Sequence, residues 1–292
     1  MSDFQKQTVQ WFPGHMAKTR RQIRESLPLV DAVTELLDAR IPLSSRNPEL
    51  NELISGKPHI VLLNKCDMAD EEATRRWKAW FSAQGTPALA VDCRSGRGLS
   101  GYGDTVRTLL REKLRANAEK GMAGRALRVM VVGIPNTGKS SFINRMAGRS
   151  RAKVADRPGV TRQNQWFAIG GGIELLDTPG VLWPKFEDPE VGNRLAFIGS
   201  VKDEVIDVET LALRLLAVLG AQYPARLCER YQLDEEQAAQ SEPYALLEQI
   251  GRRRGMLMRG GEIDTERASA MLLDEYRAGR LGRITLEFPP EG

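Results

Sequence analysis

The chain has 292 residues, of which 41% are hydrophobic and 27% charged, and it carries no compositionally biased tract. This composition excludes collagen-like, low-complexity and intrinsically disordered proteins, and the length fits two domains of about 150 residues each. Apolar runs fall short of the roughly 18 residues that cross a bilayer, and the polar start lacks the apolar core of a signal peptide. We therefore expect a cytoplasmic protein without membrane contact.

Charge is divided unequally along the chain. Residues 1–184 carry 28 Lys/Arg against 18 Asp/Glu, a net charge of +10, whereas residues 185–292 carry 14 against 20, a net charge of −6. A basic half suits a polyanionic partner, although a solvated basic surface explains the count equally well. The three cysteines form no CxxC pair, so neither a disulfide framework nor a zinc site is expected.

The first part of the chain alternates helices with short apolar runs. In chain order, the pattern predicts a basic helix at 15–27, strands at 32–37 and 59–63, a helix at 70–83, a strand at 88–91 and one long basic helix at 104–119. Such alternation is typical of an α/β fold built on a parallel sheet.

Beyond residue 126 the pattern continues and then changes. A strand at 127–132 leads through a glycine loop into a helix at 141–147, and a hairpin pairs 165–169 with 173–176. Over 190–285 the apolar residues recur at helical spacing, which predicts a small all-helical domain.

The loop Gly133–Ser140 matches the pattern GxxxxGK[ST]. Its glycines let successive backbone N–H groups converge on phosphate oxygens, and the following helix adds the partial positive charge of its amino terminus. The lysine reaches the terminal phosphates, and the hydroxyl of Ser140 binds the Mg²⁺ that bridges them. We expect nucleotide contacts from Asn136, Thr137, Gly138, Lys139, Ser140 and Ser141.

The predicted strand at 59–63 ends in Asn64, Lys65, Cys66 and Asp67, from which we expect contacts to the base. A carboxylate at Asp67 accepts paired hydrogen bonds from the N1–H and amine of guanine, which adenine cannot offer, so the ligand should be GTP or GDP rather than ATP. The stem of Lys65 can cover the base face, while Asn64 can join neighbouring loops. The plain alternative is a polar turn after a strand.

Two further segments complete the expected phosphate site. In Asp177-Thr178-Pro179-Gly180, the carboxylate would approach Mg²⁺ through water and the N–H of Gly180 would face the γ-phosphate. Thr161 is the candidate for a second hydroxyl on the metal, held only while that phosphate is present.

These motifs stand in an unusual order, because the guanine motif precedes the phosphate loop. A circular permutation that cuts one α/β domain after DxxG preserves every strand neighbour and so preserves the pocket. We therefore predict a circularly permuted P-loop GTPase domain at 29–184, preceded by a basic arm at 1–28 and followed by a helical domain at 185–292. The cut also sends the segment after Gly180 directly into the helical domain, so hydrolysis could reorient that domain.

The permuted order, together with Trp11–Lys18, Asp38–Pro42 and Ser45–Pro48, closely resembles the ribosome biogenesis GTPase A family, also called YlqF. The resemblance implies a slow GTPase, stimulated by ribosomal particles, that binds rRNA and protein of a maturing large ribosomal subunit and leaves on hydrolysis. It implies no DNA partner. The family's helical domain is regarded as RNA-binding, but here that half is net acidic, with one tight cluster at Arg252–Arg254 and Arg259. We therefore expect RNA contact mainly from residues 18–24 and the basic GTPase surface.

The resemblance also implies roles for individual residues. It places Asp92 and Cys93 in the loop whose backbone N–H groups meet the guanine oxygen. The residue after DxxG is Val181, which has no polar atom to orient water, and the resemblance assigns that work to His15. The alternative that His15 only contacts RNA or caps the amino-terminal arm stays open. An asparagine at 136 implies a bound K⁺ and stimulation by potassium.

Two alternatives remain at this stage. One is a GTP-dependent RNA-binding scaffold whose hydrolysis is incidental. The other is a permuted GTPase that acts on the small subunit or on tRNA, although the appended oligonucleotide-binding fold or zinc site of small-subunit members is not evident in this sequence.

Overall fold

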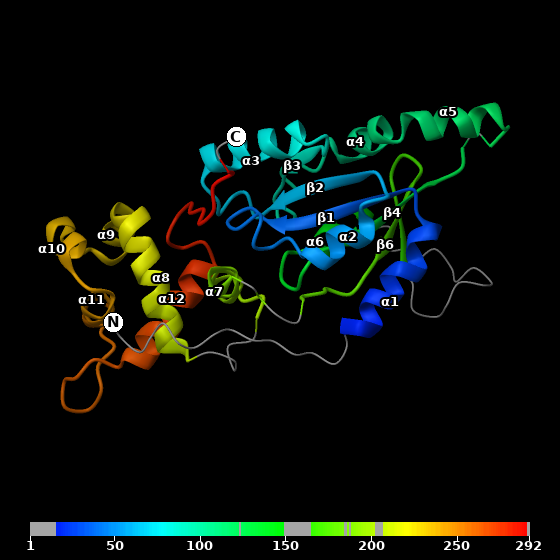
Figure 1. Cartoon of the computed structure of the whole chain (residues 1–292). Coiled ribbons are helices and arrows are strands. Elements are labelled where there is room, and N and C mark those ends of the chain that lie inside the picture. Colours follow the sequence, from blue (N-terminus) through cyan, green and yellow to red (C-terminus); the bar gives the residue numbers. More distant parts are fainter. Residues whose placement is uncertain are drawn as a thin grey trace. The chain divides into compact units, whose positions relative to one another are not determined.

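The computed structural model describes residues 16–122, 124–148, 165–183, 186, 188–201 and 207–290. These residues divide into two compact units (Figure 1). The first takes in the described residues between 16 and 183 together with 287–290, and the second takes in those between 186 and 286. No helix in this part of the chain is long and apolar enough to span a bilayer.

A six-stranded sheet forms the centre of the first unit, in the order β3-β2-β1-β4-β6-β5. The strands are β1 (Ala32–Asp38), β2 (His59–Asn64), β3 (Ala88–Ala90), β4 (Leu127–Val132), β5 (Gln165–Ile169) and β6 (Ile173–Asp177). Neighbours pair in parallel, except that β5 runs antiparallel to β6 as the predicted hairpin. The fold confirms the predicted permuted α/β domain, because the strand that leads into the phosphate loop, β4, lies directly beside β1.

Helices cover both faces of this sheet (Figure 1). They are α1 (Met16–Ser26), the short 3-10 turn η2 (Leu27–Leu29), α2 (Pro48–Ile54), α3 (Glu71–Ala83), α4 (Tyr102–Leu109), α5 (Arg111–Glu119) and α6 (Lys139–Ala147). Strand β1 shows how the two faces are filled, since Ala32 and Leu36 pack with α4 and α6 whereas Val33 and Leu37 pack with α1, α2 and α3. Burial on both faces explains the continuous apolar runs of the central strands.

Two helices differ from the prediction. The helix expected at 104–119 is divided at Leu110 into α4 and α5. Tyr102, Val106 and Leu110 are buried in the core under the sheet, whereas α5 has no fully buried residue and packs there through the partly buried Leu114. Helix α2 was not predicted, because its seven residues are too few for a clear periodicity. Its start is nonetheless marked by Asn47 as N-cap and Pro48 in the first turn.

The described residues of the second unit form helices and connecting loops, with one isolated β-bridge between Leu257 and Ile263. Its helices are α7 (Pro189–Phe197), α8 (Val208–Gln222), α9 (Pro224–Tyr231), α10 (Glu235–Gln240), α11 (Pro243–Arg253) and α12 (Thr265–Arg277). The long helix α8 packs against both α11 and α12 and buries Leu211, Leu215 and Leu219 at the predicted helical spacing. Asp264 caps α12 by accepting from the N–H of Arg267.

Candidate nucleotide site

Loops that carry the guanine motif, the phosphate loop and the DxxG motif leave the sheet at one edge. Strands β1, β2, β4 and β6 are parallel, and their carboxyl ends lead into Asp38, Asn64, Gly133 and Asp177. In open α/β sheets this edge is where ligands bind, because neighbouring loops diverge there and leave a crevice. The site is thus drawn from segments that are far apart in the sequence.

The phosphate loop is pressed against the guanine motif at Gly138. This glycine has φ +98°, and a Cβ placed on it would lie 2.2 Å from Nδ2 of Asn64. A side chain is therefore excluded by both backbone conformation and space. Asn136 also has a positive φ of 63°, which gives the loop a second left-handed turn before α6 begins at Lys139.

The side chain of Lys139 folds back onto the phosphate loop. This side chain is buried, and Nζ donates hydrogen bonds of 3.1 Å to the carbonyl oxygens of Gly133 and Ile134. Burial lowers the pKa of Lys139 to about 8, and the nearby Asp177 carboxylate opposes that shift only in part. The same burial raises the pKa of Asp177, against the effect of the Lys139 charge. Backbone carbonyls neutralise an ammonium poorly, so this cation favours an incoming anion.

Gly180 brings the DxxG segment to the same lysine. A Cβ on Gly180 would lie 2.9 Å from Nζ of Lys139 and 2.9 Å from the backbone N of Pro135. The absence of a side chain therefore lets the two segments meet. The following residue, Val181, is buried, and its N–H donates to the carbonyl of Gly133 at 3.3 Å.

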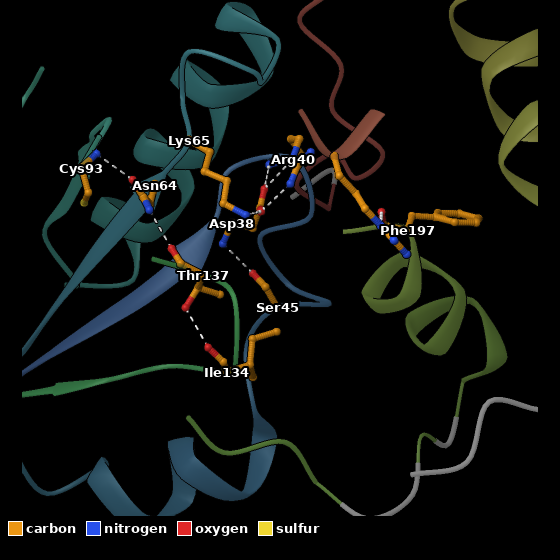
Figure 2. Close-up of polar contacts among 10 residues, drawn as sticks. Asp38, Arg40, Ser45, Asn64, Lys65, Cys93, Ile134, Thr137 and Phe197 are labelled. Carbon is orange, nitrogen blue, oxygen red and sulfur yellow. Dashed lines mark hydrogen bonds and ion pairs between the residues drawn. The ribbon is translucent and has the colours of Figure 1, made fainter. Parts of the chain in front are cut away.

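Asn64 joins three segments with one buried amide (Figure 2). Its Nδ2 donates to the carbonyl oxygen of Thr137 at 2.6 Å, and its Oδ1 accepts from the N–H of Cys93 at 2.9 Å. The ends of β2 and β3 and the phosphate loop are thereby held together. This is the loop-joining arrangement that the sequence suggested for Asn64.

Lys65, Cys66 and Asp67 follow directly. Lys65 is one of three non-glycine residues with positive φ among the described positions, at 60°, and its Nζ lies 2.9 Å from Oδ2 of Asp38. Cys66 is half-buried, whereas Asp67 is exposed and so can receive a ligand. A left-handed non-glycine residue costs about 1–3 kcal/mol, so neighbouring contacts must hold this turn in place.

The Asp92–Cys93 loop presents backbone rather than side chain. The Asp92 carboxylate accepts from the N–H groups of Arg94 at 2.8 Å and Ser95 at 3.2 Å. Burial would raise the pKa of Asp92, but these hydrogen bonds outweigh it and lower the pKa. Burial raises the pKa of Cys93 to about 12, so its thiol stays protonated. The side chains of Asp92 and Cys93 therefore help to define the conformation of the loop.

Asp38 and Arg40 form a buried ion pair at the end of β1, although the sequence motif Asp38–Pro42 indicated no role for either residue. Nε and Nη2 of Arg40 donate to the two carboxylate oxygens at 2.9 and 2.8 Å, and both side chains are at most 1% exposed. Burial alone would raise the pKa of Asp38, but the positive charges of Arg40 and Lys65 lower it below its usual range. The sequence did hold one signal for this ion pair, namely an aspartate at the end of a buried strand that neighbours the strand of the guanine motif.

Asn47, at the start of α2, connects the segment that follows β1 to the DxxG segment. Its Oδ1 accepts from the N–H groups of Glu49 and Leu50 as the cap of α2, and its Nδ2 donates to the carbonyl of Val181 at 3.0 Å. The buried amide therefore holds the residue that follows Gly180.

The predicted metal ligands fit Mg²⁺ in their chemistry. Ser140 is exposed at the first turn of α6, and Asp177 is partly buried at the end of β6, so both offer the oxygen donors that this hard cation prefers. The described residues contain no group of three or more His, Cys, Asp or Glu arranged around one point. Mg²⁺ commonly takes only one or two protein oxygens and completes its shell with substrate phosphates and water. His15 and Thr161 lie outside the described residues.

A permuted parallel sheet with a phosphate loop, a guanine motif and DxxG at one edge defines a circularly permuted P-loop GTPase. The family model described as a 50S ribosome-binding GTPase matches residues 128–241. That match begins at the phosphate-loop strand and leaves out Asn64–Asp67, as the permuted order requires.

Full-length relatives specify the family further. "Ribosome biogenesis GTPase A" of Bacillus cereus is 47% identical over 97% of this chain and 95% of its own, and that of Priestia megaterium is 47% identical over 97% and 98%. A solved structure titled as GDP-bound TM YlqF is 29% identical, covers 93% of this chain and 100% of its own, and has a TM-score of 0.66. The chain belongs to the ribosome biogenesis GTPase A family, and it is a GTPase that uses Mg²⁺, as is general for that class.

Proposed function

We propose that this GTPase is a cytoplasmic assembly factor that binds a maturing large ribosomal subunit and leaves it when GTP is hydrolysed. The observation that carries the proposal is the buried Asn64 amide, which unites the guanine motif with the phosphate loop in a chain whose relatives are named for ribosome biogenesis. A site that binds both GTP and GDP gives the protein two nucleotide states, and release from the subunit on hydrolysis requires two such states.

Each predicted contact has a place in this scheme. Asp67 reads the guanine edge, Lys65 covers the base, and the N–H groups of the loop from Asn136 to Ser141 hold the phosphates with Lys139. Bound Mg²⁺ neutralises phosphate charge, with Ser140, Thr161 and Asp177 as its proposed protein partners. Gly180 offers its N–H to the γ-phosphate, and the Asp92–Cys93 backbone faces the guanine oxygen.

The attacking water needs a polar partner that Val181 cannot supply, and we assign that role to His15. Neutral imidazole accepts a hydrogen bond or a proton near neutral pH. A His15→Ala variant should keep its GTP affinity and lose particle-stimulated turnover. Unchanged stimulated turnover would favour a role for His15 in RNA contact or as a cap of the amino-terminal arm instead.

Potassium is the proposed second cation, with Asn136 as its ligand. The left-handed backbone and exposed side chain of Asn136 place it at the outer surface of the phosphate loop. Turnover should be faster in potassium than in sodium buffer of equal ionic strength, and equal rates would refute this part of the proposal.

RNA is the proposed polyanionic partner. On α1, Ile23 packs into the sheet while Lys18, Arg21 and Arg24 are exposed, so the basic face of the helix is turned to solvent. Phosphate contacts from such a face release counterions, and binding should weaken steeply with salt. Charge reversal at Lys18 and Arg24 should weaken particle binding and reduce its salt dependence.

The DxxG segment continues directly into the helical unit, so a change at the γ-phosphate can be transmitted to that unit and cause release from the ribosomal particle. We propose that the γ-phosphate changes the segment after Gly180 and with it the orientation of the helical unit, which ends at Leu286. Small-angle scattering or cross-linking should distinguish the GDP state from that with a non-hydrolysable GTP analogue. Identical results in both states would refute this coupling.

The decisive experiment asks which particle the protein follows. Tagged protein should sediment with large-subunit precursors when lysate contains a non-hydrolysable GTP analogue, and should leave them with GDP. Sedimentation with small subunits or with tRNA would favour the rival permuted GTPases. Growth supported by a non-hydrolysing variant would favour the scaffold.

A further inference from the structure

We infer that Asp38 is a positioning residue for Lys65 in the guanine site, and that Glu287, near the carboxyl end of the chain, latches the loop that holds Asp38. The inference rests on the proposed role of Lys65 at the base. It gives the residues after the helical unit a place in nucleotide binding.

Asp38 is placed to orient the lysine. Its Oδ2 lies 2.9 Å from Nζ of Lys65, and Figure 2 shows the lysine side chain extending to the buried carboxylate, while 22% of that side chain stays exposed. Arg40 fills the remaining carboxylate positions with a bidentate pair, which fixes the plane of the carboxylate. A long flexible side chain held at its tip loses the freedom to leave the base, so binding needs less ordering.

The loop after β1 in turn holds Asp38. Its backbone N–H donates to Oγ of Ser45 at 3.0 Å, and the same hydroxyl donates to the carbonyl of Pro42 at 3.1 Å. The N–H of Ile41 donates to the carbonyl of Asp38 at 3.0 Å. The position of the aspartate therefore depends on a loop that contains no helix or strand.

Glu287 secures that loop across 243 residues of sequence. Its carboxylate accepts from the N–H of Leu43 at 2.8 Å and the N–H of Ser44 at 3.0 Å, and it also accepts from the Ser44 hydroxyl. The Glu287 backbone carbonyl accepts from Nε1 of Trp77 on α3 at 2.9 Å. With 8% exposure, Glu287 is built into the GTPase unit, although it follows the helical unit directly in the chain.

These contacts form one continuous path from Glu287 through Ser44 and Ser45 to Asp38 and Lys65. Release of the carboxyl tail should loosen the loop, free Lys65 and speed the loss of bound GDP. A partner that displaces the carboxyl tail through its covalent link to the helical unit would then speed nucleotide exchange.

The test is a double-mutant cycle on the dissociation rate of a fluorescent GDP analogue from the full-length protein. Lys65→Ala should speed dissociation, and Asp38→Asn should speed it about tenfold in the wild-type background but less than about twofold in the Lys65→Ala background. An equal effect of Asp38→Asn in both backgrounds would overturn the inference, because a merely structural aspartate acts regardless of Lys65. If Lys65→Ala alone changes nothing, the proposed base site itself fails.

Glu287→Ala tests the latch, with the exposed Glu262→Ala as the matched control. We expect a severalfold faster dissociation for the first variant, abolished by Lys65→Ala, and the wild-type rate for the second. The wild-type rate in Glu287→Ala would overturn the latch. If Asp38→Asn does not fold, Ser45→Ala replaces it in the cycle, since it removes the hydroxyl that accepts from the N–H of Asp38.

Discussion

The two halves of the nucleotide site differ in how their charges are partnered. On the base side, Asp38 is paired with Arg40 and Lys65, and the amide of Asn64 both donates and accepts. On the phosphate side, the ammonium of Lys139 donates to two backbone carbonyls, and burial depresses its pKa. The charges of the Asp38, Arg40 and Lys65 network are partnered within the protein, whereas the phosphate side is stabilised further by a ligand's negative charge.

This difference separates stability from binding. Removing a charge from a completed buried network leaves its partner uncompensated, which destabilises the fold. Removing a buried charge whose hydrogen-bond partners are neutral carbonyls relieves a desolvation cost, which for Lys139 is offset only in part by the loss of its attraction to Asp177. Loss of a charge from the Asp38 network should therefore lower the free energy of unfolding. Loss of the Lys139 charge should leave it unchanged or raise it.

The largest expected effect on stability is at Asp38. Asp38→Asn leaves Arg40 and Lys65 facing a neutral amide and should cost roughly 3–5 kcal/mol of unfolding free energy. Chemical denaturation measures the loss, with the exposed Asp67→Asn as a control that should stay within about 0.5 kcal/mol. A loss below about 1 kcal/mol for Asp38→Asn would show that the base-side network is not a stability element.

Lys139→Ala should show the reverse pattern. GTP turnover should fall by about 100-fold or more, because the lysine stabilises charge on the transferred phosphate. The unfolding free energy of the nucleotide-free protein should stay the same or rise, since a buried ammonium is removed. Single-turnover hydrolysis and denaturation of the same preparation check both parts. A variant that is strongly destabilised would contradict the contrast between the two halves.

Acid should remove the contribution of Asp38. Because the pKa of Asp38 is lower in the folded protein than in the unfolded chain, its stabilisation is present above about pH 4 and is lost as pH falls below that value toward the folded pKa. Wild-type protein should therefore lose more stability than Asp38→Asn between pH 4 and lower pH. Parallel pH profiles for the two proteins would exclude this linkage.

The smallest expected effect is at Asn47, which caps α2 and holds Val181. Asn47→Ala should cost about 0.5–2 kcal/mol, the usual range for loss of an N-cap. Asn47→Asp keeps the cap and loses the Nδ2 donor, so comparison of the two variants by thermal unfolding separates the cap from the contact with Val181. An equal loss of stability in both variants would show that the contact with Val181, rather than the cap, accounts for the effect.

The elements on which the site is built could be predicted from the sequence because they depend on local pattern. The runs before Asn64 and Gly133 have the length of buried strands, and a parallel sheet brings their carboxyl ends to one edge. The division of the helix at Leu110 was not predictable in this way, because no glycine or proline marks it in the sequence.

The network behind Lys65 was also beyond local pattern. Asp38 precedes Lys65 by a whole helix and a strand, and the contact depends on β1 pairing with β2 in the observed register. Glu287 lies at the far end of the chain from Ser44, so no periodicity or spacing connects the two. Such contacts are decided by tertiary packing, which sequence patterns describe only through burial.

The central claim is that motifs in permuted order build one pocket selective for guanine nucleotides, with Asp67 as the reader of the base. Calorimetric titration of the wild-type protein and Asp67→Ala with GDP and with ADP tests it most directly. The account predicts tight binding of GDP and no measurable binding of ADP by the wild type, and loss of that preference in Asp67→Ala. Similar affinities of the wild type for GDP and ADP, or undiminished GDP preference in the variant, would contradict it.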